Sequence, residues 1–274
     1  MGTRALRQAG WYLLLIALSV LVLFPIYLTL VRALSQPGAY TSRRFPLYPV
    51  HIEWDVFERA WTDARMGRAL LRNGIATVLT VAAQVVTSVL AAYAFVFLRF
   101  PVKRVVFAVF MSTLLLPIEV TLLANVQTIR ELEWIDSMQA LVIPFAATAF
   151  GTFLIRQGFA GVPTDIRDAA RLDGHGHLAF LLRFAIPLTR PVLASFTVIA
   201  TLGAWGQYLW HRAVIEDPDA ATLGIALRDL TLTQVDESNL GAAGALLGAI
   251  PIVILLIAFQ RHIVKGLTAG AVKG

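Results

Sequence analysis

The chain has 274 residues, of which 58% are hydrophobic and 15% are charged, and it contains no cysteine. Soluble domains average about 45–50% apolar and about 25% charged residues. Here the apolar residues also stand in uninterrupted blocks, which excludes a soluble enzyme and a disordered chain. The net charge of +6 is divided among the gaps between these blocks, unlike the basic face of a nucleic-acid-binding protein. The composition therefore predicts an all-α, polytopic membrane protein.

Six apolar segments are long enough to cross a hydrocarbon core of about 30 Å, which takes about 20 helical residues. In chain order they are 11–31, 75–98, 105–126, 138–155, 192–210 and 240–259. The first is too long and too rich in bulky residues for a cleaved signal peptide, so we expect it to be retained. We expect residues 1–74 to hold this span and a first external loop, and residues 75–274 to form a five-helix core.

Lysine and arginine in the connections predict the orientation of the spans. With the N-terminus inside, the cytoplasmic segments hold 13 basic and 3 acidic residues, and the two later external loops hold 3 basic and 9 acidic residues. The first external loop, 32–74, runs against this pattern because it carries seven arginines and four acids. The remaining connections outweigh it, so we expect both termini in the cytoplasm.

The connection 156–190 is longer than a simple link needs to be, so we expect it to have a function of its own. Pro163 ends the preceding helix, and Thr164 or Asp165 can cap a new one. The residues that follow place apolar side chains on one face of this helix, namely Ile166, Ala169 and Ala170. Gly174 predicts a turn, after which a second apolar stretch begins. The connection therefore presents a short amphipathic helix to the cytosol.

The run Asp168-Ala-Ala-Arg-Leu-Asp-Gly174, followed by Ile-Pro187-Leu, resembles the cytoplasmic-loop motif of ABC importer permeases. In that family a Glu-Ala-Ala-x-x-x-Gly run with a downstream Leu-Pro forms the coupling helix that docks on an ATPase subunit. Other segments, in the same order, resemble sugar-importer permeases: 93–95, 99–101, 116–120, 153–159, 162–163, 205–210 and 260–274. The resemblance covers about 75–274, is to the shorter permease type of the maltose importer, and implies the six-helix type I permease fold.

The resemblance also implies site residues and partners. The residues that would couple the chain to an ATPase are Asp168, Ala169, Ala170, Leu172, Asp173 and Gly174. The implied partners are a second homologous permease, two ATPase subunits and an extracytoplasmic solute-binding protein, assembled in the lipid of the bacterial cytoplasmic membrane. Two positions depart from the family pattern: Asp168 stands where glutamate is usual, and His175 stands where alanine usually follows Asp-Gly.

A few polar and aromatic residues in the spans are candidates for the translocation path. Glu119 is the only acid within a predicted span, and an intramembrane carboxylate is a functional candidate. A structural pairing beside a proline kink explains it equally well. Asn125, Trp205 and Gln207 are weaker candidates. For Trp210 we favour the interfacial aromatic belt.

The chain lacks the motifs of an enzyme. A P-loop needs Gly-Lys followed by Ser or Thr, and the three lysines are followed by Arg104, Gly266 and Gly274. His175 and His177 suggest a metal site, but nearby loop histidines are usually solvated and no further His or Cys cluster completes one. We therefore expect no cofactor, no metal and no catalytic residue in this chain.

The predicted function is that of the permease subunit of an importer for a sugar or sugar derivative. A permease for another small solute, such as a phosphodiester or a polyamine, is an alternative within the same class. A stand-alone secondary transporter or a membrane-embedded enzyme is the alternative from other classes. Co-purification with an ATPase would distinguish the two classes.

Overall fold

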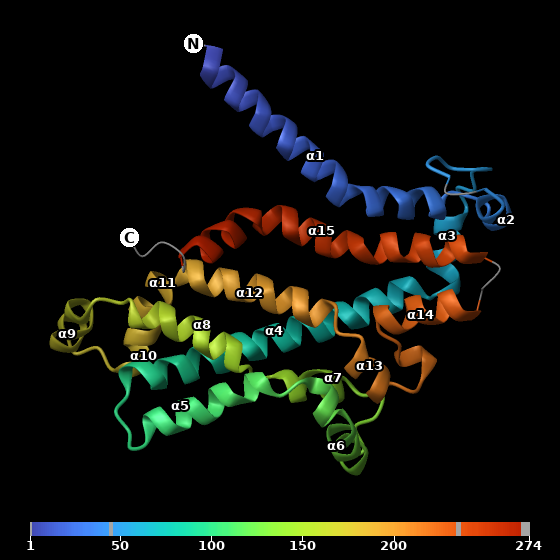
Figure 1. Cartoon of the computed structure of the whole chain (residues 1–274). Helices are drawn as coiled ribbons and strands as arrows, with labels where there is room; N and C mark the ends of the chain where they lie inside the picture. Colours follow the sequence, from blue (N-terminus) through green and yellow to red (C-terminus); the bar gives the residue numbers. More distant parts are fainter. Residues whose placement is uncertain (1, 44–45, 234–236, 270–274) are drawn as a thin grey trace. The chain divides into compact units, whose positions relative to one another are not determined.

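The computed structural model describes the backbone of residues 2–43, 46–233 and 237–269, and the side chains of these ranges except 2–7, 233 and 261–269. Residues 270–274, the end of the segment that resembles the importer permeases, lie outside the described residues. The α-helices are α1 (Gly2–Ala33), α2 (Pro37–Thr41), α3 (Val56–Asp63), α4 (Met66–Phe97), α5 (Lys103–Ser112), α6 (Ile118–Glu131), α7 (Met138–Val142), α8 (Ala149–Ala160), α9 (Thr164–Leu172), α10 (His177–Phe180), α11 (Ile186–Leu188), α12 (Arg190–Trp205), α13 (Leu209–Val214), α14 (Leu223–Thr233) and α15 (Ser238–Ala269). Shorter helical turns are η1 (Thr113–Leu115), η2 (Ile143–Phe145), η3 (Leu181–Ala185) and η4 (Pro218–Ala220). The prediction of an all-α chain is confirmed (Figure 1).

The described residues contain three helices that are long and apolar enough to cross a membrane, and they fall on the first, second and sixth predicted spans. The other three predicted spans are bent helix pairs, so up to six spans result if each pair counts as one. The pairs are Lys103–Leu115 with Ile118–Glu131, bent by 98°, Met138–Phe145 with Ala149–Ala160, bent by 46°, and His177–Leu188 with Arg190–Trp205, bent by 80°. The segments 105–126, 138–155 and 192–210 are therefore interrupted helices, and the proline kink considered beside Glu119 is observed.

Each break has a local cause in the backbone. Leu116 and Pro117 are extended, because a residue before proline avoids the helical region and proline lacks the N–H that continues the ladder. Thr148, which precedes α8, is likewise extended, with φ −140° and ψ 130°. The third pair breaks at Thr189, between α11 and α12, where the backbone has φ −107° and ψ 14°. α12 then ends at Trp205, with Gly206 as its C-cap, five residues before the predicted end of the fifth span.

The chain divides into two compact units, one formed by the residues up to Leu70 with Ile225–Ile250, the other by Leu71–Gly224 with the chain from Pro251 onward. The core of the first unit joins α1, α3, α14 and α15 through Ala33, Val56, Ala60, Leu230, Leu240 and Ala243. α3 lies inside the predicted first external loop, which is thus partly helical. The guanidinium of Arg59 on α3 lies 2.9 Å from Glu53 and 2.6 Å from Glu237, which ties the α3 segment to the start of α15.

The second unit has an aromatic core between α4, α8, α10 and α12. Its buried members include Tyr93, Phe97, Phe159, Phe180 and Phe196, and the rings of the first four contact one another in tilted and edge-to-face arrangements. α8 and α12 run alongside each other, with α9 projecting from one end of this unit and α6, α7 and α13 at the other end (Figure 1). The core therefore holds the base of α9 and leaves its outer face free.

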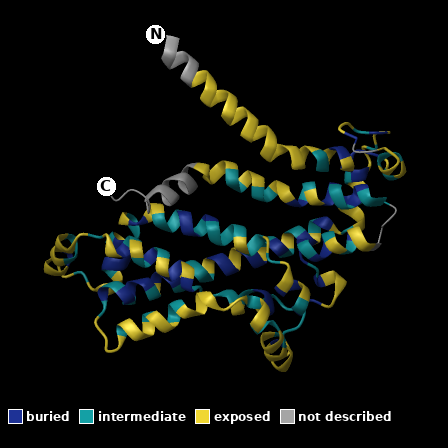
Figure 2. Cartoon of the chain, viewed as in Figure 1, coloured by how far each residue is buried: buried dark blue, intermediate teal, exposed yellow. Residues whose placement is uncertain are grey.

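Much of the apolar surface outside these cores is exposed. Along α1 the side chains of residues 8–26 are exposed, and so are many on α5 (Figure 2). A soluble monomer rarely exposes apolar surface on this scale. These faces fit contact with lipid or with another membrane helix.

Candidate functional site

α9 is a short amphipathic helix, as the sequence predicts. Pro163 occupies its N-cap position, and no side chain caps the first turn, so the expected capping by Thr164 or Asp165 is not observed. Its inner face is anchored in the aromatic core, because Ala170 is only 2% exposed and Ile166 packs against the same cluster. The helix is therefore fixed to the second unit by its apolar side.

The outer face of α9 carries the remaining predicted coupling residues. Leu172 is 90% exposed, and the Asp168 side chain is 58% exposed. Ala169 and Asp173 are exposed beside them, so this face is open to solvent (Figure 2). An exposed leucine flanked by carboxylates is suited to contact with another protein.

The turn after α9 explains why Gly174 is needed. Gly174 has φ +78°, a left-handed conformation that is strained for residues with a Cβ. The backbone N–H of Gly174 donates to the carbonyl of Arg171 at 3.0 Å, and that of His175 donates to the carbonyl of Ala170 at 2.9 Å. This pair of hydrogen bonds is the Schellman motif, which closes a helix C-terminus. His175 occupies the position after the glycine, where its ring lies 5.4 Å from that of Phe184.

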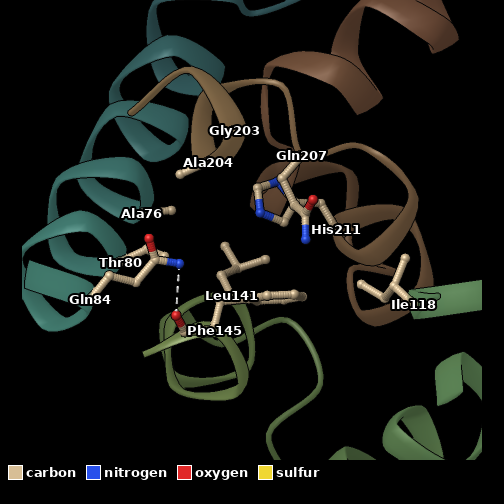
Figure 3. Close-up of a pocket in the computed structure, with 10 residues that line it drawn as sticks. All are labelled: Ala76, Thr80, Gln84, Ile118, Leu141, Phe145, Gly203, Ala204, Gln207 and His211. Atoms are coloured by element: carbon tan, nitrogen blue, oxygen red, sulfur yellow. Dashed lines mark hydrogen bonds between the residues drawn. The ribbon is translucent and has the colours of Figure 1, made fainter. Parts of the chain in front are cut away.

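A cavity of about 240 Å³ opens at the other end of the second unit. It is lined by Ala76, Thr80, Gln84, Ile118, Leu141, Phe145, Gly203, Ala204, Gln207 and His211. Figure 3 shows Thr80 and Gln84 of α4 on one side of it, with Gln207 and His211 on the opposite side. The Gln84 amide donates to the carbonyl of Phe145 at 2.9 Å, which fixes the orientation of its side chain.

The lining of this cavity is mostly apolar, and its four polar side chains, Thr80, Gln84, Gln207 and His211, include no carboxylate, lysine or arginine. His211 is buried, and its Nδ1 lies 3.1 Å from the Thr222 hydroxyl. Burial, with the nearby Arg72 guanidinium, lowers the pKa of His211 to about 4, so its imidazole is neutral at physiological pH. The cavity thus offers hydroxyl, amide and imidazole groups beside one aromatic ring. Such groups hydrogen-bond and stack against a polyhydroxylated solute.

The four predicted path residues do not all lie at this cavity. Gln207 lines the cavity. Trp205 is not among the lining residues, and its backbone carbonyl accepts a hydrogen bond from the Asn73 amide at 3.3 Å. Glu119 and Asn125 are exposed on α6 and are not among the lining residues, although Ile118, next to Glu119, is.

The prediction that Trp210 lies in the interfacial aromatic belt was wrong. It is 1% exposed, and its indole N–H donates to the carbonyl of Ala140 at 2.9 Å, so it belongs to the interior of this unit and not to an interfacial belt. Thr80, Gln84 and His211 were missed. Thr80 and Gln84 are polar residues four apart in an apolar span, a spacing that puts both on one helix face and signals a polar lining.

An all-α chain with this many apolar helices is a polytopic membrane protein. Residues 68–269 match the family described as "Binding-protein-dependent transport system inner membrane component". The chain therefore belongs to that family, and it is an inner-membrane component of a binding-protein-dependent transporter.

Similar proteins agree with this membership. The sn-glycerol-3-phosphate transport system permease protein UgpE of Yersinia pestis is 30% identical over 264 residues, covering 93% of this chain and 94% of its own. The protein of the same name from Escherichia coli O157:H7 is 32% identical over 254 residues, covering 90% of both chains. A chain in the crystal structure of a bacterial ABC transporter that imports the acidic polysaccharide alginate has the same fold, with a TM-score of 0.80, 24% identity, and coverage of 95% of this chain and 98% of its own.

Proposed function

We propose that this chain is the permease subunit of an ATP-driven importer that carries a sugar or sugar derivative across the cytoplasmic membrane. It would act with a second homologous permease, two ATPase subunits that hydrolyse ATP, and an extracytoplasmic solute-binding protein. Both of its termini would face the cytoplasm. Family membership over residues 68–269 supports the transport role, and the absence of charged side chains from the cavity lining supports a sugar as the solute.

The chemistry of the cavity favours a neutral solute. Binding a phosphate or a carboxylate out of water needs a paired cation, because an unpaired buried charge is costly. The lining supplies Thr80, Gln84, Gln207 and a neutral His211 instead. The relatives named for sn-glycerol 3-phosphate make that solute the second candidate.

We further propose that the outer face of α9 docks on an ATPase subunit. The exposed side chains of Asp168, Ala169, Leu172 and Asp173 would contact the partner, while Ala170 anchors the helix to the core and Gly174 closes it. Closure of the ATPase dimer on ATP would then move α9 together with the second unit. The free energy for this movement would come from the higher affinity of ATP for one of two conformations.

The test is uptake by the complex purified with its partner subunits and reconstituted in proteoliposomes. Radiolabelled maltose, trehalose and sn-glycerol 3-phosphate are offered with and without ATP. We expect ATP-dependent uptake of a neutral sugar. Uptake of sn-glycerol 3-phosphate alone would overturn the choice of solute, and uptake that ignores ATP would overturn the ABC mechanism.

Gln207→Ala tests the cavity directly. Removing a hydrogen-bonding side chain from the lining should raise the KM of uptake several-fold with little change in the amount of protein inserted. The matched control is Gln127→Ala, because Gln127 is exposed on α6 and its amide donates to Glu131 at 3.0 Å. Equal KM values for the two variants would argue against solute contact at Gln207.

A further inference from the structure

A second cavity, of about 120 Å³, lies between the inner side of α9 and the end of α4. It is lined by Tyr93, Phe97, Arg167, Arg171, His175, Gly176, His177 and Phe180. Two arginines and two histidines thus surround one small space, and no acidic residue is among the residues that line it. The two α9 arginines are four residues apart, where like charges face each other along a helix and repel.

These two guanidinium groups are poorly neutralised. Among the described residues, both form an ion pair with Asp168, whose Oδ1 is 3.4 Å from Arg167 Nε and 3.9 Å from Arg171 Nη1. Both distances exceed the 2.7–2.9 Å of a good charge-assisted hydrogen bond, and Asp168 lies on the exposed face of the helix. Each guanidinium carries five N–H donors, so most of them are left for another anion.

The remaining walls suit a compact anion with several oxygens. The Tyr93 hydroxyl lies 2.9 Å from His177 Nδ1, so a hydroxyl and an imidazole meet beside the arginines. The Phe97 and Phe180 rings close the inner side, where they lower the local polarity and strengthen a charged contact. Arginine forks match the oxygen spacing of phosphate groups and bind them through paired hydrogen bonds.

We propose that this cavity binds a phosphate-type anion, supplied either by a free phosphate or by the phosphodiester of an anionic lipid headgroup. The bound anion bridges α9, the turn at Gly176 and α4, and it cancels the repulsion between Arg167 and Arg171. It therefore holds α9 in one orientation against the second unit. This site is separate from the solute cavity and does not depend on which solute is carried.

The experiment measures thermal unfolding of the full-length chain, purified with its partner subunits, by tryptophan fluorescence. One arm compares sodium phosphate with sodium chloride at equal ionic strength. The other compares nanodiscs of neutral lipid with nanodiscs that contain phosphatidylglycerol. The variants are Arg167→Gln with Arg171→Gln, and the same pair changed to lysine, which keeps the charge but loses the planar fork. The control is Arg183→Gln with Arg190→Gln, two exposed arginines of the same unit that do not line the cavity.

We expect phosphate or phosphatidylglycerol to stabilise wild type and the control. The glutamine pair should bind the same probe with at least tenfold lower affinity, and the affinity of the lysine pair should lie between the two. A response to both probes identifies a site open to free phosphate, and a response to phosphatidylglycerol alone identifies the lipid headgroup as the source. If the glutamine pair does not fold, weaker binding by the lysine pair than by wild type supports the site. The proposal is overturned if the control pair loses the response equally, or if the arginine and lysine forms respond alike.

Discussion

At the scale of single residues, Gly174 is the position where the backbone leaves least choice. Its φ of +78° and the two hydrogen bonds that close α9 depend on a residue that tolerates the left-handed region. A Cβ added at Gly174 meets no other atom within 4 Å, so the requirement is conformational and not one of space. This explains in physical terms why the run from Asp168 ends in a glycine at position 174.

Gly174→Ala should therefore destabilise the end of α9 by about 1–2 kcal/mol, the cost of a left-handed residue with a side chain. Hydrogen exchange at the amides of Gly174 and His175 measures it, with faster exchange expected. Gly161→Ala is the control, because Gly161 is also a helix C-cap but has φ −83°. Equal exchange in both variants would show that the turn does not need glycine.

His211 predicts how stability depends on pH. Its pKa is lowered from 6.5 to about 4 in the folded chain, chiefly by burial. Above pH 6.5 both folded and unfolded states hold neutral imidazole, so the shift has little effect there. As the pH falls from 6.5 to 4 the unfolded chain binds a proton that the folded chain does not, so stability falls, by up to about 3 kcal/mol.

Thermal unfolding between pH 7.5 and 5 tests this, with His211→Gln as the variant. Glutamine keeps a hydrogen-bonding group near Thr222 and does not titrate, so the variant should lose less stability on acidification than wild type does. Parallel curves for the two proteins would contradict the assignment of the slope to His211.

At the scale of elements, the second unit depends on close contact between α8 and α12. A Cβ placed on Gly151 of α8 would lie 2.3 Å from Cζ of Phe196 and 2.5 Å from Oγ of Ser88. Phe196 is 1% exposed and belongs to the aromatic core, so its ring has no free space to move into. Glycine is needed here because the helices approach so closely.

Gly151→Ala should lower the free energy of unfolding by about 1–3 kcal/mol, as overpacked cores do. Unfolding in detergent, followed by tryptophan fluorescence, measures it. Gly74→Ala in α4 is the matched control, because an added Cβ there meets nothing within 4 Å and alanine favours a helix over glycine. A Gly151 variant as stable as the control would show that α8 and α12 are not in tight contact.

The sequence predicted the number and place of the apolar elements and raised a proline kink at Pro117, but it did not predict the other two bends. Pro117 sits at the sharpest bend and was a readable signal, since proline removes a helical hydrogen bond. The bend before α8 depends on the extended backbone of Thr148, which apolar length does not reveal.

The path residues show the same limit. Thr80 and Gln84 share a helix face, but Gln207 and His211 reach the cavity only after α12 ends at Gly206.

At the scale of the whole molecule, the two ends of the second unit have different chemistry. One end holds a cavity with uncharged polar groups in a mostly apolar lining, and the other presents α9 with an exposed leucine between carboxylates. The aromatic core lies along the helices that connect them. A helix fixed to such a core moves as part of it, because closely packed interiors transmit displacement. This arrangement supports the proposal that a partner subunit bound to α9 moves the cavity at the other end.

ATP-dependent uptake by the Leu172→Asp variant, in proteoliposomes with matched amounts of inserted protein, tests the central claim most directly. A carboxylate at this 90% exposed position leaves the fold of α9 intact and adds unpaired charge to the proposed docking face. We predict at least a tenfold loss of uptake and of ATPase co-purification, with no loss in the Leu132→Asp control, which changes an exposed leucine at the end of α6. Wild-type uptake by Leu172→Asp would contradict the account.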